Sequence, residues 1–562
     1  MGVIKFCALG GLGENGKNLY LVTIDDKILI LDAGLKYPSV DLLGIDAVIP
    51  DMSYLYENKN NILGIFLSHG HEESCGAVVE LLRNINIPVF GTHFTISVVE
   101  CALLDAGLDY TNYRLYRIND DKVLTFGNVK VSFFNTTHSI PESVGISVNT
   151  EDGAIVYAPD FSLSSTKDVR YQTSFDRISD IAKDKVLMLC TESLGVNNVN
   201  RVNNDYAFNY TINEILQNSK RVIFSMFSHD LNRIQKVVDL CVKHNRKIAI
   251  IGRKVQRIIN VAMNTDYLKV PNDNLVNLRF IDEYNDNNLE DLAVIVTGVR
   301  HEPYFMLQRM ITNQDKLIKI VDTDNVVIIS PPVLGTEKIA TRAKDQLSRI
   351  GCKVHSLSRN VLKSSHADGE DLMMLYQMLK PEYICPVMGE YRHQYVQKQI
   401  ASEAGYSDKK IIVLENGEQI TFVDGVLQDT KTKITVGDVL IDGSIVGDIN
   451  EVVLHDRECL SEEGAVLVVT NIDSVKRRII SGPKLVSRGF GLKAQEEIEE
   501  DVINVAYEII SKELENKNII DWNNLKNNLR EGIAYEIKSI CRKCPIIIPV
   551  IIDVNGEDLW EI

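Results

Sequence analysis

The sequence predicts an α/β protein built from several domains, and three changes of pattern along the chain predict it. The 562 residues allow three or four domains at ~100–200 residues each. Short apolar runs typical of strands fill residues 1–205. Helical and strand patterns alternate in residues 206–364, and residues 451–562 show a strand, two helices and a final strand. These changes indicate separate cores within one chain.

The N-terminal region predicts strands joined by loops. The strands are expected at residues 4–9, 18–24, 27–32, 64–68, 129–134 and 153–157, with a helix at 77–83. Gly11–Gly16 has the GxGxxG spacing of a dinucleotide-binding turn, but that function needs a helix next. Two strand patterns around an Asp25-Asp26 turn come next instead, which predicts a β-hairpin. The glycines therefore predict a tight loop and no nicotinamide site.

The middle and C-terminal regions predict compact α/β units. In the middle, helices are expected at 207–218 and 231–244, and strands at 221–227, 247–252, 292–297 and 326–330. Such alternation is typical of a parallel sheet with covering helices. In the C-terminal region, we expect a strand at 465–470, a helix at 498–514, a second helix starting near Trp522 and a strand at 546–554.

Composition narrows the class of protein. The chain carries 60 basic and 77 acidic residues, a net charge of −17, so RNA or DNA would need a local basic groove. No apolar run approaches the ~18 residues of a membrane span, and the N-terminus lacks the apolar segment of a signal peptide. Ten dispersed cysteines fit a reducing compartment, and the pair Cys541/Cys544 lacks a second pair to complete a zinc site. We therefore expect an intracellular protein without membrane contact.

Three loops that follow strands carry metal-ligand residue types. His69 and His71 come directly after the strand at 64–68, while His138 and Asp160 follow two further strands. Loops at strand ends present side chains from a rigid sheet. Three imidazoles and a carboxylate suit Zn²⁺ or Mn²⁺ with an open position for water. The alternative on spacing alone is a set of loop histidines that bind no metal.

These residues, with motifs further along the chain, carry a resemblance to a known family. The motifs are Gly10–Gly16, Asp32, His69-Gly-His71, His138, Asp160, Ser330-Pro-Pro332, Ser365-His-Ala367, Pro386–Arg392 and Ser487–Phe490. Their order resembles the ribonuclease J group, bacterial nucleases of the metallo-β-lactamase and β-CASP type. The resemblance implies a metallo-β-lactamase αββα sandwich formed by residues 1–205 and 365–435. It also implies an inserted β-CASP domain at 206–364, a linker at 436–450 and a small C-terminal α/β domain at 451–562.

The resemblance also implies a site and a function. His69, His71, His138 and Asp160 are the expected ligands of one Zn²⁺ or Mn²⁺ ion. The implied catalytic residues are Asp160, Glu192 and His366, and the implied substrate-binding residues are Lys363, Ser364, Ser365, His366 and Arg233. The implied activity is cytoplasmic RNA processing and decay, by 5′-to-3′ exonuclease and internal cleavage, on RNA with a 5′ monophosphate.

The chain departs from the family at the second metal site. Where the family motif reads HxHxDH, this chain has Glu73 and Ser74, and Met388 replaces a third ligand. A hydroxyl and a thioether are poor ligands for such ions, so we expect this second site to be weak or empty. Taken singly, Met388 could pack in a core and Ser74 could cap a helix near Gly76. Asp230 also stands in a family phosphate-binding segment, where it would repel a phosphate.

The sequence thus predicts a ribonuclease J paralogue of the degenerate second type. Its expected role is weak or absent nuclease activity and an accessory function beside an active sister subunit. Homo- or hetero-oligomers are expected to form through the C-terminal domain. The alternatives are a fully active ribonuclease that uses one metal, and a hydrolase of small esters on the same fold.

Overall fold

The computed structural model describes most of the chain. The described residues are 2–39, 41–164, 166, 168–198, 205–252, 256–278, 281, 291–333, 335–358, 361–362, 364–443, 445–447, 449–489, 492–516 and 519–554. Within these ranges, no helix is both long and apolar enough to cross a membrane. The chain divides into two compact units, one formed by Met1–Tyr37 and Ala47–Val439, the other by Pro38–Asp46 and Leu440–Ile562.

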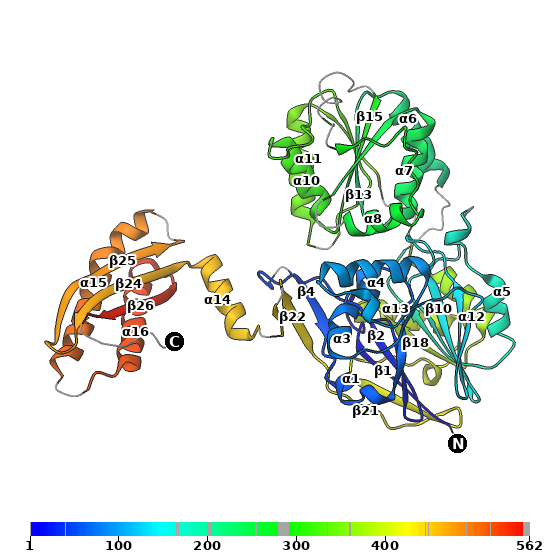
Figure 1. Ribbon diagram of the computed structural model, residues 1–562, viewed down its shortest axis with the longest axis horizontal. Helices are drawn as coiled ribbons and strands as arrows, with labels where there is room; N and C mark the ends of the chain where they lie inside the picture. The colour runs from blue at the N-terminus through cyan, green and yellow to red at the C-terminus, as the bar shows by residue number, and fades with distance from the viewer. Residues whose placement is uncertain are drawn as a thin grey trace. The chain divides into compact units, whose positions relative to one another are not determined.

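Two sheets of the first unit form a sandwich (Figure 1). One sheet has the order β20-β19-β1-β2-β3-β5-β6-β7, with β21 paired to β19. Its strands are β1 (Val3–Gly10), β2 (Leu19–Ile24), β3 (Lys27–Leu31), β5 (Ile62–Phe66), β6 (Val89–Gly91), β7 (Leu115–Arg117), β19 (Glu418–Val423), β20 (Val426–Leu427) and β21 (Thr432–Lys433). The other sheet has the order β18-β12-β11-β10-β9-β8. Its strands are β8 (Val123–Phe126), β9 (Val129–Asn135), β10 (Val144–Thr150), β11 (Gly153–Ala158), β12 (Val186–Glu192) and β18 (Tyr383–Val387).

The core of this sandwich lies between the two sheets. Phe6 and Val22 of the first sheet share one buried cluster with Val131, Ile146 and Tyr157 of the second. The outer faces carry α1 (Ser53–Glu57), α3 (Val78–Asn84) and α4 (His93–Asp105) on one side, and α5 (Phe175–Ile181), α12 (Gly369–Leu379) and α13 (Tyr391–Glu403) on the other. The short α2 (Glu72–Cys75) follows the loop after β5. The αββα sandwich predicted from the sequence is therefore confirmed. So is the β-hairpin after the glycine loop, where Tyr20 pairs with Leu31.

The middle region forms a parallel sheet with helices on both sides (Figure 1). The strand order is β14-β15-β13-β16-β17, and neighbouring strands in it run parallel. The strands are β13 (Val222–Phe227), β14 (Lys247–Ile251), β15 (Leu292–Gly298), β16 (Asn325–Ile328) and β17 (Lys353–Ser356). The helices are α6 (Asp205–Gln217), α7 (Leu231–Lys243), α8 (Gln256–Asn264), α10 (Glu302–Ile311) and α11 (Glu337–Ile350). The predicted parallel α/β insert is confirmed.

The second unit has a sheet in the order β25-β24-β26 under two long helices. Its elements are α14 (Glu451–Glu462), β24 (Ala465–Asp473), β25 (Arg478–Arg488), α15 (Leu492–Glu515), α16 (Trp522–Cys541) and β26 (Ile546–Asp553). Val466 and Val468 of β24 pack against Ile498, Leu525 and other apolar residues of the helices. The predicted strand, two helices and strand are confirmed, whereas α14 and β25 were not predicted.

The segment between the units is more ordered than the predicted linker at 436–450. It contains β22 (Asp438–Asp442) and β23 (Ile445–Val446), which pair with each other in antiparallel fashion. The remaining strand, β4 (Ala47–Pro50), is fully buried. The domain boundaries themselves stay predictions.

Candidate metal centre

Three histidine side chains converge at one end of the sandwich. His69 and His71 lie in the loop after β5, and His138 lies in the loop after β9. His69 Nε2 and His138 Nε2 each lie 3.1 Å from His71 Nδ1, and all three side chains are buried. The strands hold the loops in place because their apolar residues pack in the core between the sheets.

The opposite nitrogen of each ring meets an oxygen of the protein. His69 Nδ1 lies 2.8 Å from Ser68 Oγ. His71 Nε2 lies 3.0 Å from the His229 carbonyl, and His138 Nδ1 lies 3.0 Å from the Ser365 carbonyl. A carbonyl can only accept a hydrogen bond, so the outer nitrogens of His71 and His138 carry protons. The inner nitrogens are therefore unprotonated, and their lone pairs point toward one another. Burial lowers the pKa of all three rings, that of His69 to about 3, which keeps them neutral.

A buried carboxylate supports the first of these rings. Asp32 accepts hydrogen bonds of 2.7 Å from the Ser68 amide, the Ser68 hydroxyl and the Tyr157 hydroxyl. Because Ser68 Oγ donates to Asp32, it accepts from His69 Nδ1, which fixes the orientation of that imidazole. Burial raises the pKa of Asp32 to about 7, even though these donors lower it.

Asp160 lies between the three rings and His366. It follows β11, is 1% exposed, and its Oδ2 lies 3.6 Å from His69 Nε2. Its Oδ1 forms an ion pair of 3.0 Å with His366 Nδ1, while its Oδ2 faces the histidine rings. Burial alone would raise its pKa, but neighbouring His366, His138 and His69 hold it well below the usual range. His366 balances the charge on the Oδ1 side, and the three lone pairs with Oδ2 form a donor set that a cation would fit.

His366 and Glu192 form the other wall of this centre. His366 Nδ1 lies 2.8 Å from Glu192 Oε2 and 3.0 Å from Asp160 Oδ1. Glu192 Oε1 accepts from the amides of Phe161 and Ala367, so the carboxylate is held firmly in place. Burial would lower the pKa of His366, but the charges of Glu192 and Asp160 raise it well above its usual value. The ring is therefore an imidazolium near neutral pH.

The residues at the expected second metal site do not form a ligand set of their own. Glu73 Oε1 lies 3.5 Å from His71 Nδ1, and this side chain is 36% exposed. Ser74 is fully buried in α2, and its hydroxyl has no partner within the described part of the chain. The suggestion that Ser74 caps a helix near Gly76 is wrong, because the residue before α3 is Ala77 and no side chain caps that helix. Met388 packs in the core between the two sheets, as its alternative interpretation expected.

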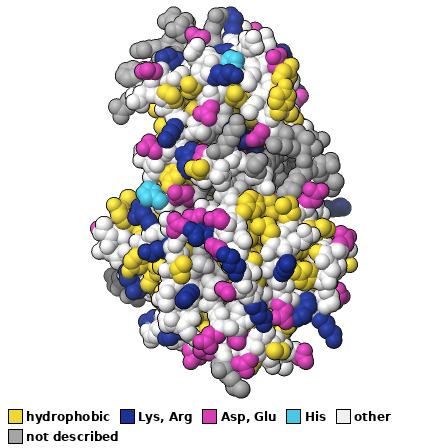
Figure 2. Space-filling model, turned by 90° about the vertical axis from the view of Figure 1, so that its right-hand side faces the viewer, with side chains coloured by type: hydrophobic (Ala, Val, Ile, Leu, Met, Phe, Trp, Pro, Cys, Tyr) yellow, Lys and Arg dark blue, Asp and Glu magenta, His cyan; other side chains and the backbone are white. Residues whose placement is uncertain are grey.

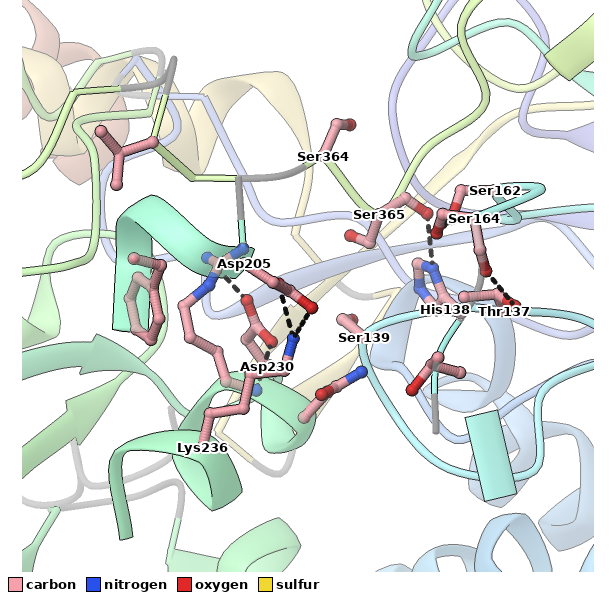
Figure 3. A pocket seen from close by; sticks show the side chains of 15 residues that line it. Thr137, His138, Ser139, Ser162, Ser164, Asp205, Asp230, Lys236, Ser364 and Ser365 are labelled. Carbon is pink, nitrogen blue, oxygen red and sulfur yellow. Dashed lines mark hydrogen bonds and ion pairs between the residues drawn. The ribbon is translucent and has the colours of Figure 1, made fainter. Parts of the chain in front are cut away.

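A pocket next to the metal centre contains several of the predicted substrate-binding residues (Figure 3). Ser364, Ser365 and Arg233 line it together with His138, whereas Lys363 lies outside the described residues. The full lining is Thr137, His138, Ser139, Ser162, Ser164, Thr166, Asp205, Phe208, Asp230, Asn232, Arg233, Lys236, Val361, Ser364 and Ser365.

Sequence reasoning missed several residues of this region. Asp205 and Lys236 line the pocket as an ion pair, and the His229 carbonyl binds His71 across 158 residues of chain. Local sequence patterns cannot predict such contacts, because the contacts depend on how the inserted domain packs on the sandwich. Ser68 could have been found, because it precedes His69 and short polar residues beside a ligand commonly orient it.

The fold and the site together define a class of protein. Three buried imidazoles and a buried carboxylate, at the end of an αββα sandwich with an α/β insert, are the donor set of a metallo-hydrolase. Four family descriptions match successive parts of the chain. They are Metallo-beta-lactamase superfamily (12–163), Ribonuclease J, beta-CASP domain (219–347), Zn-dependent metallo-hydrolase RNA specificity domain (350–414) and Ribonuclease J C-terminal domain (452–554).

Similarity to characterised sequences extends over nearly the whole chain. Ribonuclease J 2 of Staphylococcus aureus (strain NCTC 8325 / PS 47) is 34% identical over 557 residues, 98% of each chain. Ribonuclease J2 of Bacillus subtilis (strain 168) is 35% identical over 553 residues, 98% of this chain and 99% of that one. The chain therefore belongs to the ribonuclease J family. Its class is that of metal-dependent ribonucleases of RNA processing.

A solved structure shares the fold at low sequence identity. The crystal structure of a protein of unknown function from Enterococcus faecalis V583 covers 75% of this chain and 100% of its own. The identity is 13% and the TM-score is 0.50, so this likeness concerns the fold alone.

Proposed function

We propose that this chain is a weak metal-dependent ribonuclease, with 5′-to-3′ exonuclease and internal cleavage activity, that assists an active sister subunit. The observation that carries the proposal is the buried Asp160 carboxylate, which pairs with His366 through Oδ1 and faces three imidazole lone pairs through Oδ2. That donor set fits one Zn²⁺ or Mn²⁺ ion held by His69, His71, His138 and Asp160. When bound, such an ion supplies a Lewis acid and activates water at neutral pH.

The chain's own residues supply the proton chemistry and the orientation of the substrate. The imidazolium of His366 keeps Nδ1–H on Glu192, which leaves Nε2–H to donate to a phosphate or to the leaving oxygen. Glu192 acts as a positioning residue, because two backbone amides fix one of its oxygens while the other holds His366. The raised pKa of His366 keeps this proton in place at pH 7.

The weakness of the activity follows from the second site. Phosphodiester hydrolysis by two ions ~3.5–4 Å apart uses both to stabilise charge on the attacking and leaving oxygens. Here Glu73 offers one partly exposed carboxylate, Ser74 offers a buried hydroxyl, and Met388 packs in the core. A second ion would therefore bind weakly or not at all, and each 1.4 kcal/mol lost in the transition state slows the reaction about tenfold.

The accessory role is supported by the second unit and by the surface charge. In that unit the helices cover one face of the sheet, while Ile548 and Ile552 of β26 are exposed, as are Val452 and Leu460 of α14. Such apolar surface fits homo- or hetero-oligomers with a sister ribonuclease J, in the cytoplasm. On the face drawn in Figure 2, acidic side chains lie interspersed with basic ones, which favours RNA capture in a shared complex over capture by this chain alone.

An exonuclease assay with a matched pair of variants tests this function. With Mn²⁺ and a 5′-labelled RNA, we expect slow release of nucleotides that stops when EDTA is added. His366→Asn should lower the rate about 100-fold or more, because it removes the proton donor while leaving the three imidazoles in place. His355→Asn is the control, because His355 in β17 bonds to Asn325, outside the centre.

The proposal predicts a particular order of rates. The parent and His355→Asn should be equally slow, and addition of an active sister subunit should raise the rate above that of the sister alone. An RNA that no combination cleaves, or a His366→Asn variant as active as the parent, would rule out the proposed function.

A further inference from the structure

The pocket beside His138 is rich in hydroxyl groups. Ser139, Ser162, Ser164 and Ser365 line it, and further hydroxyls come from neighbouring residues of the same loops (Figure 3). The Ser365 carbonyl accepts from His138 Nδ1, so the wall of the pocket and the wall of the metal centre share this residue. A nucleotide bound in this pocket would therefore lie next to the phosphodiester bond that is cleaved at the metal centre.

Within the described lining of the pocket, Arg233 and Lys236 are each paired with a carboxylate of the pocket. Arg233 lies 2.7 Å from Asp230 Oδ2, and Lys236 Nζ lies 2.8 and 2.9 Å from the two oxygens of Asp205. Figure 3 shows Asp205 and Asp230 close to Lys236 on the same side of the pocket. Asp230 also caps α7, because its Oδ1 accepts from the Arg233 amide. The pair of Asp230 and Arg233 is largely buried, with side-chain exposures of 14% and 19%.

The charges of the described lining therefore cancel. Two positive groups, Arg233 and Lys236, meet two negative ones, Asp230 and Asp205. A terminal phosphate carries about −1.5 to −2 charges at pH 7 and would have to draw both cations from their carboxylates. Two carboxylates would then face the phosphate across the same small space, so the attraction of the cations is offset by this repulsion.

We propose that Asp205 and Asp230 set the 5′-end specificity of this chain, so that the pocket accepts a 5′-hydroxyl nucleotide as well as a 5′-monophosphate. This inference rests on the proposed function, since it concerns the RNA that reaches the metal centre. The ribose and 5′-hydroxyl find donors and acceptors in the serine hydroxyls, and no net charge is required for binding. The family resemblance implies that the RNA must carry a 5′ monophosphate. Under this proposal, the chain binds RNA with similar affinity whether or not the 5′ phosphate is present.

Binding measurements on two RNAs that differ only at the 5′ end test this inference. The full chain is titrated into fluorescently labelled RNA with a 5′ hydroxyl or a 5′ monophosphate, in EDTA, so that no cleavage intervenes. We expect the two dissociation constants of the parent to agree within about threefold. Asp205→Asn with Asp230→Asn should tighten the 5′-monophosphate RNA about tenfold or more, because each cation could then form a charge-assisted hydrogen bond with the phosphate. Binding of the 5′-hydroxyl RNA should change little.

Two comparisons control for other causes. Asp239→Asn removes the same charge from the exposed surface of α7, outside this pocket, and should leave the ratio of the two constants at the parent value. In Asp230→Asn, the asparagine oxygen can still cap α7. Asp205→Asn alone does not alter this cap, so this single variant tests the pocket even if the double variant folds poorly.

The results separate this inference from the proposed function. A parent that prefers the 5′-monophosphate RNA tenfold or more would overturn the inference, even if the chain proves to be a ribonuclease. So would a double variant that still does not discriminate, an Asp239→Asn variant that discriminates equally well, or a failure of the parent to bind either RNA. A chain that binds both RNAs equally yet cleaves neither would leave the inference standing and refute the proposed function alone.

Discussion

Removing the Ser68 hydroxyl should weaken metal binding without touching any ligand. In Ser68→Ala, His69 Nδ1–H loses its acceptor at 2.8 Å, and Asp32 loses one of three donors at 2.7 Å. A buried donor left without a partner costs about 1–3 kcal/mol. Loss of a group that orients a metal-bound histidine lowers affinity about 10–100-fold, which equals about 1.4–2.7 kcal/mol, so the two estimates agree.

A competitive titration with a chromophoric chelator measures this loss. Zn²⁺ is partitioned between the chelator and the protein, and the dissociation constants of parent and variant are compared. Ser147→Ala is the control, because Ser147 is equally buried in β10 and its hydroxyl bonds Asn149 instead of a histidine. Equal affinity of Ser68→Ala and the parent, or an equal loss in Ser147→Ala, would show that Ser68 does not orient the ligand.

Three further outcomes are expected. The triple variant Glu73→Asp, Ser74→His and Met388→His should bind close to two ions and gain at least about tenfold in exonuclease rate, since three ligands together can fix a second ion. If it binds two ions and stays slow, the defect lies in RNA placement. A chain truncated after residue 445 should be monomeric by light scattering and no longer bind the sister subunit; unchanged mass with binding intact would contradict this. In the metal-free protein, the pKa of Asp32 is raised from 3.8 to about 7. The contribution of Asp32 to the free energy of unfolding is thus present below about pH 4 and is lost as the pH rises to about 7. The loss amounts to about 4 kcal/mol. Urea unfolding at several pH values should show this loss in the parent and a much smaller one in Asp32→Asn.

The elements that the sequence predicted best are those with strong local periodicity. In α7, the apolar positions Leu231, Ile234, Val237, Val238 and Cys241 repeat at helical spacing, and all are buried. The hairpin of β2 and β3 could be distinguished from a dinucleotide-binding turn because its apolar runs and Asp25-Asp26 turn are adjacent in the chain. The short strands β22 and β23 fall within the predicted linker, because strands of five and two residues show no usable alternation.

The positions of the histidines were predictable for a similar reason, but the contacts made by the inserted domain were not. His69, His71 and His138 each follow an apolar strand, so their position at one end of a sheet could be inferred from the chain. The pairing of Asp205 with Lys236 depends instead on the packing of α6 against α7. The contact of His71 with the His229 carbonyl depends on the placement of the insert on the sandwich. Such contacts between distant segments leave no pattern in a single sequence.

The metal content of the purified chain tests the central claim most directly. After saturation with Mn²⁺ or Zn²⁺ and removal of free ions, inductively coupled plasma mass spectrometry should find about one ion per chain, held by the three imidazoles and Asp160. His71→Ala should lower this value toward zero. No ion bound to the parent would contradict the claim that this site holds metal. Two ions per chain together with fast, processive decay of RNA would contradict the claim that the second site has been lost.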